Sequence, residues 1–226
     1  MREVVVDTET TGLDPEEGHR IVEVACIELL HHVPTGRKFH RYVNPEREMP
    51  EDALAVHGLT QEFLAGHPRF AAVADEFLAF IGTDRLVIHN ADFDIAFLNA
   101  ELTRLGRPPL AMPLMDTLSL ARRRFPGAPA SLDALCRRFE IDLVERERHG
   151  AVIDCRLLAE VYLELLGGRQ PGLDLMGANV AEAGTGSREA ERIARPPRPH
   201  EPSPEELAAH LAMLQTITAP LWLHGA

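Results

Sequence analysis

Apolar residues change their spacing repeatedly along the first three quarters of the chain, from the short continuous runs of strands to the period of helices. Runs rich in Val and Ile, bounded by turn signals, predict strands at residues 3–7, 20–29, 39–43 and 86–88. Helical spacing and capping signals predict helices at residues 51–56, 70–81, 93–105, 131–139 and 150–166, with another beginning after Thr60. Strands alternating with helices indicate an α/β domain.

The pattern changes after this domain, which we place at residues 1–166. Residues 167–204 are rich in Gly, Pro, Ala and charge and have no apolar period, which is typical of a flexible linker. Residues 205–226 open with two glutamates and then carry apolar residues at helical spacing: Leu207, Leu211 and Leu214, followed by Trp222. A short amphipathic helix behind a linker has no core of its own, so we expect a tail that docks on a partner protein; folding back onto the domain is the alternative.

Bulk composition is that of an ordinary globular protein. Of the 226 residues, 45% are hydrophobic and 26% charged. The chain has no apolar run of the roughly 18 residues that a membrane helix needs, and it has no secretion signal, so we expect a cytoplasmic protein without a membrane partner. The three cysteines form no C-x-x-C pair, which favours buried reduced thiols over disulfides or a zinc site.

The formal net charge of −12 disfavours a surface that binds nucleic-acid phosphates by itself. Two interpretations remain open. Either the protein does not bind nucleic acid, or a partner holds it near nucleic acid and bound metal cations supply the positive charge.

The first acidic cluster, D-T-E-T-T-G at residues 7–12, ends the first predicted strand. Side chains two residues apart on a strand point to one face, so Asp7 and Glu9 share the strand end where α/β folds build their sites. Adjacent carboxylates repel unless a cation lies between them, and oxygen ligands suit Mg²⁺. Taken alone, the cluster is equally compatible with a solvated turn capped by Asp and Thr.

The second cluster, H-N-A-D-F-D at residues 89–94, follows another predicted strand. Asp94 shares the apolar face of the next helix, where a carboxylate is costly unless it is paired or bound to metal. Asp92 lacks this alignment and fits a first-turn carboxylate favoured by the helix dipole. We therefore favour Asp94 as a ligand, and we expect His89 to be a structural histidine with satisfied hydrogen bonds.

The third cluster, H-G-A-V-I-D at residues 149–154, begins the last helix of the domain. Asp154 lies at the edge of its apolar stripe. Five helical residues would separate His149 from Asp154 by about 140°, so the histidine reaches the same site only from the loop before the helix. A capping or surface histidine is the alternative. An imidazole that titrates near neutral pH beside a metal site favours a general base.

Together the clusters read D-x-E … D … H-x₄-D, an order that is specific. D-T-E-T-T-G-L, H-N-A-x-F-D and H-G-A-x-x-D resemble the three exonuclease motifs of the DEDD superfamily, histidine branch, and most closely those of the proofreading epsilon subunits of bacterial DNA polymerase III. Further similar stretches are V-H-G-L at residues 56–59, D-T-L at 116–118 and A-E-V-Y-L at 159–163. The resemblance covers residues 2–166, and histidine at position 149 argues against the tyrosine branch.

The resemblance implies a ribonuclease H-like fold, a mixed five-stranded sheet with an antiparallel start and helices on both sides. It implies a 3′→5′ exonuclease that removes mispaired nucleotides from the single-stranded 3′ end of DNA as nucleoside 5′-monophosphates. Four carboxylates would hold two Mg²⁺ or Mn²⁺ ions: Asp7, Glu9, Asp94 and Asp154. His149 would deprotonate the attacking water, whose pKa one ion lowers while the other stabilises the leaving 3′-oxygen. Second-tier substrate contacts would be Thr10, His57, His89, Asn90 and Asp116.

The resemblance also extends to partners. Q-P-G-L-D-L at residues 170–175 follows the Q-x-x-L-x-[LF] pattern of peptides that bind the bacterial sliding clamp, with Gln170, Leu173 and Leu175 at the specified positions. Three specified positions make a short motif, and a plain linker is the alternative. The tail would dock on the catalytic (alpha) subunit of the polymerase. Tethering to the polymerase would raise the effective concentration of the exonuclease near the DNA end. A negatively charged protein could then act on DNA despite a low intrinsic affinity.

Two other functions fit parts of the pattern. An RNA-trimming exonuclease of the same superfamily would use the same carboxylates, although a free-standing enzyme needs no docking tail. The second is not an enzyme but a scaffold that braces a polymerase while another domain proofreads. The scaffold has no reason to keep four carboxylates that repel one another.

Overall fold

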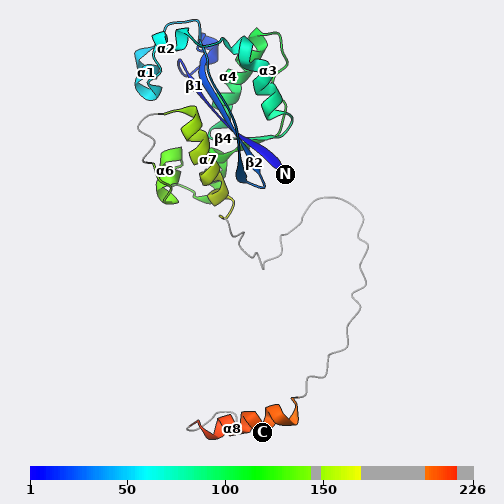
Figure 1. Ribbon diagram of the computed structural model, residues 1–226. Helices are drawn as coiled ribbons and strands as arrows, with labels where there is room; N and C mark the ends of the chain where they lie inside the picture. Colours follow the sequence, from blue (N-terminus) through cyan, green and yellow to red (C-terminus); the bar gives the residue numbers. More distant parts are fainter. Residues whose placement is uncertain (144–148, 169–201, 218–226) are drawn as a thin grey trace. The chain divides into compact units, whose positions relative to one another are not determined.

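The computed structural model describes residues 1–143, 149–168 and 202–217. The chain divides into two compact units, Met1–Leu175 and Met176–Ala226. Among the described residues, the first unit holds the sheet and seven α-helices, and the second holds one helix (Figure 1). The proposed clamp-binding peptide and Trp222 lie outside the described residues, so the division into domain, linker and tail stays a prediction.

The first unit is built on a mixed five-stranded sheet of order β3-β2-β1-β4-β5. Its strands are β1 (Arg2–Thr10), β2 (Ile21–Leu30), β3 (Val33–Tyr42), β4 (Arg85–Ile88) and β5 (Leu114–Asp116). The first three pair antiparallel in chain order, whereas β4 lies parallel to β1 and β5 parallel to β4. This is the sheet, with its antiparallel start, that the motif resemblance implies. The fold class is thereby confirmed.

Alternation along the central strand β1 divides the apolar core into two layers. Val4 and Val6 join the cluster under α3 (Phe70–Ile81) and α4 (Ala91–Arg104). Val5 faces the opposite layer, which contains α5 (Thr117–Arg124), α6 (Leu132–Arg138) and α7 (Ala151–Leu165). The two-residue period carries on to the strand end, so Asp7 and Glu9 point toward the layer that contains α7.

Two short helices, α1 (Glu51–His57) and α2 (Gln61–Ala65), follow β3. Two of the helices begin where the sequence predicts and are capped by side chains: Thr60 accepts a hydrogen bond from the Phe63 N–H, and Ser131 accepts one from the Ala134 N–H. The three cysteines are buried and unpaired, as expected from their spacing. Within the described residues, no helix has the length and apolar character to cross a membrane.

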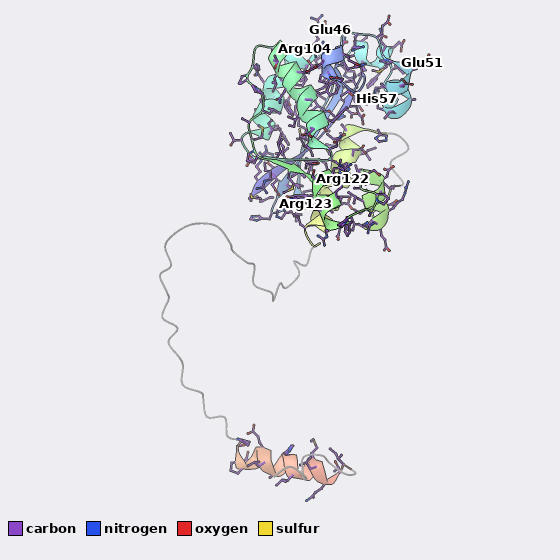
Figure 2. All side chains as sticks on the ribbon, turned by 180° about the vertical axis from the view of Figure 1, so that it is seen from behind. Glu46, Glu51, His57, Arg104, Arg122 and Arg123 are labelled. Atoms are coloured by element: carbon purple, nitrogen blue, oxygen red, sulfur yellow. The ribbon has the colours of Figure 1, made fainter. Side chains whose placement is uncertain are left out.

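Several elements depart from the sequence prediction. β3 begins at Val33 rather than residue 39, because it is an edge strand that tolerates Pro34, which has no N–H to donate. The apolar pattern does not predict β5 or α5. β5 has three residues, and α5 is polar and ends in three arginines, of which Arg122 and Arg123 are labelled in Figure 2. A 3₁₀-helix, η1 (Pro15–Glu17), lies in the turn that the sequence predicts between the first two strands.

The second unit contains α8 (Pro204–Gln215), where the tail helix is expected. Its N-terminus is a capping box: Ser203 accepts a hydrogen bond from the Glu206 N–H, and the Glu206 carboxylate accepts one from the Ser203 N–H. Leu207 and Leu211 are about half exposed, at 47% and 52%. The helix is therefore capped locally but presents apolar side chains to solvent.

Candidate active site

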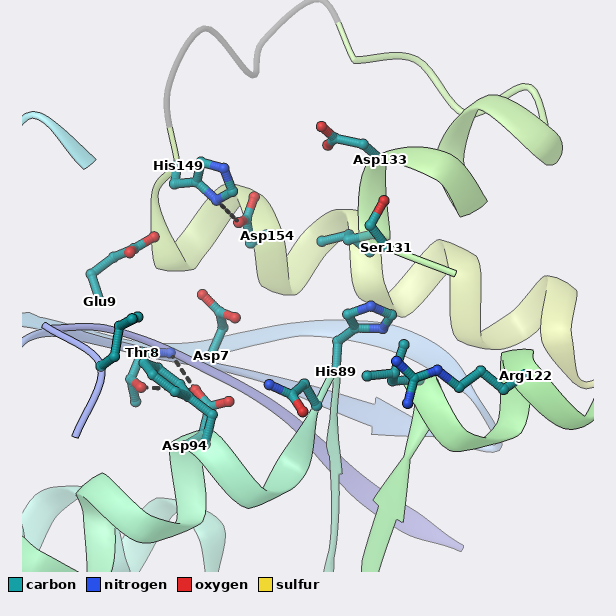
Figure 3. A pocket seen from close by; sticks show the side chains of 15 residues that line it. Asp7, Thr8, Glu9, His89, Asp94, Arg122, Ser131, Asp133, His149 and Asp154 are labelled. Atoms are coloured by element: carbon teal, nitrogen blue, oxygen red, sulfur yellow. Dashed lines mark hydrogen bonds and ion pairs between the residues drawn. The ribbon is translucent and has the colours of Figure 1, made fainter. Parts of the chain in front are cut away.

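A pocket of about 680 Å³ opens where β1 and β4 end, and all five motif residues line it: Asp7, Glu9, Asp94, His149 and Asp154 (Figure 3). Because β1 and β4 run parallel, their carboxyl ends meet at one edge of the sheet, with antiparallel β2 on the other side of β1. An edge of this kind is where open α/β sheets form their sites. The motifs that are distant along the chain thus meet in space.

Asp94 enters the pocket from the first turn of α4, on the buried face that its alignment with Phe97 and Leu98 predicts. It is 3% exposed. Its Oδ1 accepts two hydrogen bonds from Thr8 of β1, from the backbone N at 2.9 Å and from Oγ1 at 2.8 Å. These bonds tie the start of α4 to the strand that carries Asp7. Asp92 is exposed on the same turn, so the preference for Asp94 is consistent with the geometry.

His149 lies in the loop before α7, because that helix begins at Ala151 with Gly150 as its N-cap. This placement agrees with the geometric argument that a histidine within the helix would face away from Asp154. The Nδ1 atom of His149 lies 3.4 Å from Oδ2 of Asp154, and the two side chains are 50% and 6% exposed. One side of the imidazole therefore faces the carboxylate of Asp154, and the other side is exposed to solvent.

Two carboxyl groups of this pocket, those of Asp7 and Asp94, have raised pKa values. Burial raises the pKa of Asp7 well above its ordinary value, and the nearby charges of Asp94 and Glu9 raise it further. Burial also raises the pKa of Asp94 to about 7, although the hydrogen bonds from Thr8 favour its charged form. Uncompensated buried carboxylates of this kind are costly, and a cation between them removes the cost.

The donor set fits hard divalent cations. Ligand atoms of Glu9, His149 and Asp154 all lie within 4.8 Å of one another. Asp7 and Asp94 add oxygen donors on the floor of the same pocket, as Figure 3 shows. Mg²⁺ and Mn²⁺ prefer carboxylate oxygens, and a histidine at the edge suits a proton acceptor as well as a ligand. The residues present are compatible with metal-dependent chemistry.

The second-tier residues divide into three groups. His89 lines the pocket, and its Nδ1 lies 2.9 Å from the Thr117 hydroxyl, which agrees with a satisfied structural histidine. Asn90 also lines the pocket, in a left-handed backbone conformation with φ of 68°. Thr10 and His57 instead line an adjacent pocket of about 410 Å³ that shares Glu9 with the first.

Asp116 differs from the other second-tier candidates because it does not line the main pocket. Its carboxylate caps α5 by accepting hydrogen bonds from the N–H groups of Leu118 and Ser119, and it also accepts the Asn90 N–H at 3.0 Å. Burial opposes the charge, but these hydrogen bonds hold the pKa of Asp116 below its ordinary value. Asp116 therefore joins the start of α5 to the loop before α4, and its geometry supports an arranging role rather than substrate contact.

Sequence reasoning missed several residues of the pocket wall. The rest of the pocket wall comes from α5, from α6 and from the N-cap residue of α6: Leu118, Arg122, Ser131, Leu132 and Asp133. Arg122 carries charge of the opposite sign to the cluster (Figure 3). The available signal was the three consecutive arginines at the end of α5 in a strongly acidic chain.

The family model of exonucleases matches residues 4–162. The chain belongs to the exonuclease family. Among solved structures, the exonuclease resembles Exonuclease X in complex with 5′ overhanging duplex DNA, with a TM-score of 0.58 and 25% identity over 73% of this chain and 90% of that chain. The ribonuclease H-like fold and the nuclease class both follow from this membership.

Relatives that match almost the whole exonuclease are DNA polymerase III epsilon subunits. The epsilon subunit of Rickettsia felis is 46% identical over 222 residues, covering 96% of this chain and 97% of the relative. That of Escherichia coli is 41% identical over 227 residues, covering 96% and 93%. These matches extend beyond the catalytic domain into the tail, whereas the match to Exonuclease X covers 73% of the chain. The exonuclease therefore groups with the epsilon subunits, as the three motifs indicated.

Proposed function

We propose that this exonuclease is the proofreading subunit of a bacterial replicative DNA polymerase and that it removes mispaired nucleotides from the 3′ end of DNA. The observation that carries the proposal is the meeting of all five motif residues in one pocket of a chain that matches epsilon subunits over nearly its full length. In a non-catalytic scaffold, the mutual repulsion of these carboxylates would cost stability without any benefit to function.

The carboxylates of Asp7, Glu9, Asp94 and Asp154 are the proposed ligands of two Mg²⁺ or Mn²⁺ ions. When bound, such ions lower the pKa of an attacking water and stabilise charge on the leaving 3′-oxygen. The chain's own contribution is rigidity. Asp94 is fixed by its two hydrogen bonds from Thr8, and Asp7 and Glu9 lie on the part of β1 that pairs with β2.

His149 is the proposed general base. A base must reach the water that it deprotonates and then release the proton, and the imidazole of His149 borders the carboxylate cluster while half of its surface is open to solvent. The products would be nucleoside 5′-monophosphates, released one at a time.

The adjacent pocket is the proposed position of the terminal nucleoside. It shares Thr8, Glu9, Leu13 and Phe93 with the main pocket, and Val56 of α1 extends the apolar wall that Leu13 and Phe93 form beside the proposed metal ligands. An apolar slot suits a nucleobase that has left its duplex. Selectivity for mispairs then arises because a frayed end costs less to unpair than a matched one.

The tail is the proposed docking segment for the catalytic subunit of the polymerase. The exposed apolar side chains of α8, such as Leu207 and Leu211, are suited to binding in a groove on a partner protein. Gln170, Leu173 and Leu175 remain a proposed clamp-binding peptide on sequence grounds alone. Tethering by either route would let a chain of net charge −12 work on DNA with low intrinsic affinity.

The test is a 5′-labelled primer that ends in a 3′ mispair, incubated with Mg²⁺ or with a chelator. We expect shortening in steps of one nucleotide with Mg²⁺ and none with the chelator. Asp7→Ala should lower the rate by about a thousandfold or more, because several kcal/mol of charge stabilisation depend on the ligand set. Single-stranded RNA of equal length should be digested more slowly than DNA.

His149→Ala provides a second arm of this test. It should slow turnover much more than it shifts the Mn²⁺ concentration needed for half-maximal activity. Parental rates in Asp7→Ala would show that the pocket is not the active site. A preference for RNA over DNA would replace proofreading with RNA trimming.

A further inference from the structure

Helix α7 needs a cap that its own sequence does not supply. Its N-cap residue is Gly150, which has no side chain to accept the free N–H groups of the first turn. The helix nevertheless begins at a position that matters for chemistry, since His149 precedes it and Asp154 lies in its first turn. A helix start that frays would move both.

Glu23 of β2 supplies the missing acceptor from far along the chain. Its Oε2 atom accepts the N–H of Ala151, the first residue of α7, at 3.2 Å. The other oxygen, Oε1, lies 2.7 Å from Nε2 of His40 on β3. Glu23 is 3% exposed, so both oxygens of a buried carboxylate are held by neighbours. A negative charge at a helix N-terminus is also favoured by the helix dipole.

The loop that carries His149 is held from its other side by α1. The backbone N of His149 donates to the carbonyl of Val56 at 3.3 Å. The N–H groups on both sides of Gly150 are thus bound, one by Val56 and one by Glu23. Two bonds that flank one residue fix the peptide planes from which the imidazole extends.

Glu23 is also the cross-strand partner of Glu9 on β1. One carboxylate of this pair lines the active-site pocket, and the other holds the helix start that follows His149. The position of His149 relative to the acidic cluster is therefore set through one pair of neighbouring strand residues.

We propose that Glu23, oriented by His40, is a positioning residue for His149 in the hydrolysis reaction. This inference rests on the proposed function, in which His149 is the general base. Glu23 itself touches neither substrate nor the reacting atoms. It acts by keeping α7 and its preceding loop in place, so its removal should impair the step that His149 assists and leave metal and substrate binding intact.

The first experiment compares Glu23→Ala with Glu23→Gln on a single-stranded DNA primer at saturating Mg²⁺. Glu23→Ala should lower kcat by about 10- to 100-fold, because small displacements of a catalytic group are costly. KM and the Mn²⁺ midpoint of activation should stay within about twofold, a split that indicates loss at the chemical step. Glu23→Gln should retain most of the activity, because its amide oxygen accepts the Ala151 N–H while its NH₂ faces His40.

Ala151→Pro tests the same hydrogen bond from the donor side. Proline is tolerated at the first position of a helix but has no N–H, and the extended conformation of Gly150 is compatible with a following proline. This variant leaves Glu23 in place and should lower kcat to a similar extent. It keeps the proposal testable if Glu23→Ala does not fold.

Glu28→Ala is the matched control. Glu28 lies on the same strand and is similarly buried, but it is held by Arg2 and Arg37, whereas Glu23 accepts the Ala151 N–H at the start of α7. It should lose thermal stability while keeping kcat below its melting temperature. A kcat loss equal to that of Glu23→Ala would contradict the proposal, because general destabilisation would then explain both.

A double-mutant cycle with His149→Ala gives the decisive outcome. If Glu23 acts through His149, the double variant should be no slower than His149→Ala alone. Multiplied defects would overturn the inference, as would a parental kcat in Glu23→Ala. Absence of Mg²⁺-dependent hydrolysis in the parent and in Glu28→Ala would instead contradict the proposed function, so the two failures are distinguishable.

Discussion

Asp94 is a proposed metal ligand, but its buried carboxylate destabilises the metal-free fold. It is buried, burial raises its pKa to about 7, and its charge raises the pKa of Asp7. At a pH above its raised pKa, such a residue opposes folding unless a cation is bound, so its charge serves function at the expense of stability. Removing its charge should therefore separate stability from activity.

Asp94→Asn should stabilise the metal-free protein and abolish hydrolysis. Asparagine keeps an oxygen for the two hydrogen bonds from Thr8 but carries no charge. In chelator at pH 8 we expect the melting temperature to rise by a few degrees, since about 1 kcal/mol corresponds to roughly 2–4 °C in a domain of this size. Differential scanning calorimetry measures the shift. Asp92→Asn, on the exposed side of the same turn, should change neither property, and a lower melting temperature for Asp94→Asn would contradict the argument.

The raised pKa values of Asp7 and Asp94 also predict how metal-free stability depends on pH. A carboxyl whose pKa is higher in the folded state than in the unfolded state binds its proton more tightly when folded. Its stabilising effect is complete below the unfolded pKa of about 4 and is lost as pH rises through the folded pKa, which is about 7 for Asp94. In chelator, the melting temperature should fall between pH 5 and pH 8, and saturating Mg²⁺ should reduce this fall. A rise over the same interval would be the opposite of the expected sign.

Residue-level geometry made much of the site predictable. Helical phase alone separated Asp94 from Asp92 and required His149 to lie in a loop, because both arguments need only the rotation of about 100° per residue. The role of Asp116 was not accessible in this way. Its hydrogen bonds to Asn90 and Leu118 depend on the packing of two segments, and spacing along the chain does not report that packing.

At the scale of elements, prediction succeeded where an apolar period was strong. Helix α3 has the predicted bounds, whereas β5 and α5 gave no signal. β5 takes its strand conformation from parallel pairing with β4. This is a tertiary interaction, and three residues are too few to show an apolar period that would predict a strand. α5 is mainly polar, with one face contributing the buried Ala121 and another lining the pocket with Arg122.

Helix α5 leads to a prediction about how DNA lies in the pocket. No hydrogen bond or ion pair to Arg122 is found in the described parts of the chain, and its side chain lines the pocket at the end away from the acidic cluster. A cation there suits a phosphate upstream of the terminal nucleotide. Arg122→Ala should raise KM for a primer and flatten the plot of log affinity against log salt by about 0.7, the value for one phosphate contact on a single strand. Fluorescence anisotropy at several salt concentrations measures this slope.

Arg123→Ala is the control for this prediction. Arg123 is the next residue of α5 and lines a separate surface pocket but not the active-site pocket. It should leave the salt slope unchanged. Arg124 is unsuitable as a control, because it donates a hydrogen bond to the carbonyl of Leu165 and so helps to hold α7. Equal slopes for parent and Arg122→Ala would exclude a phosphate contact at Arg122.

At the scale of the whole molecule, catalysis and partner binding should be separable. Both core clusters are formed by residues of the first unit, between Val4 and Leu165, and the motif residues of the pocket lie within the same span. The protein comprising residues 1–168 should therefore fold, melt within about 2 °C of the full chain and keep its kcat on single-stranded DNA. It should no longer co-elute with the catalytic subunit of the polymerase in size-exclusion chromatography.

Leu211→Glu in the full chain distinguishes docking by α8 from other effects of truncation. Leu211 is 52% exposed, and the helix is capped by its own residues, so a charged residue at this position should leave the helix folded. The charge would disrupt the apolar face that is proposed to bind the partner. The variant should keep the parental kcat and lose co-elution with the polymerase subunit. Co-elution at the parental level would assign docking to another segment. Slower hydrolysis of single-stranded DNA without the partner would mean that the tail packs on the catalytic domain, the alternative that the sequence left open.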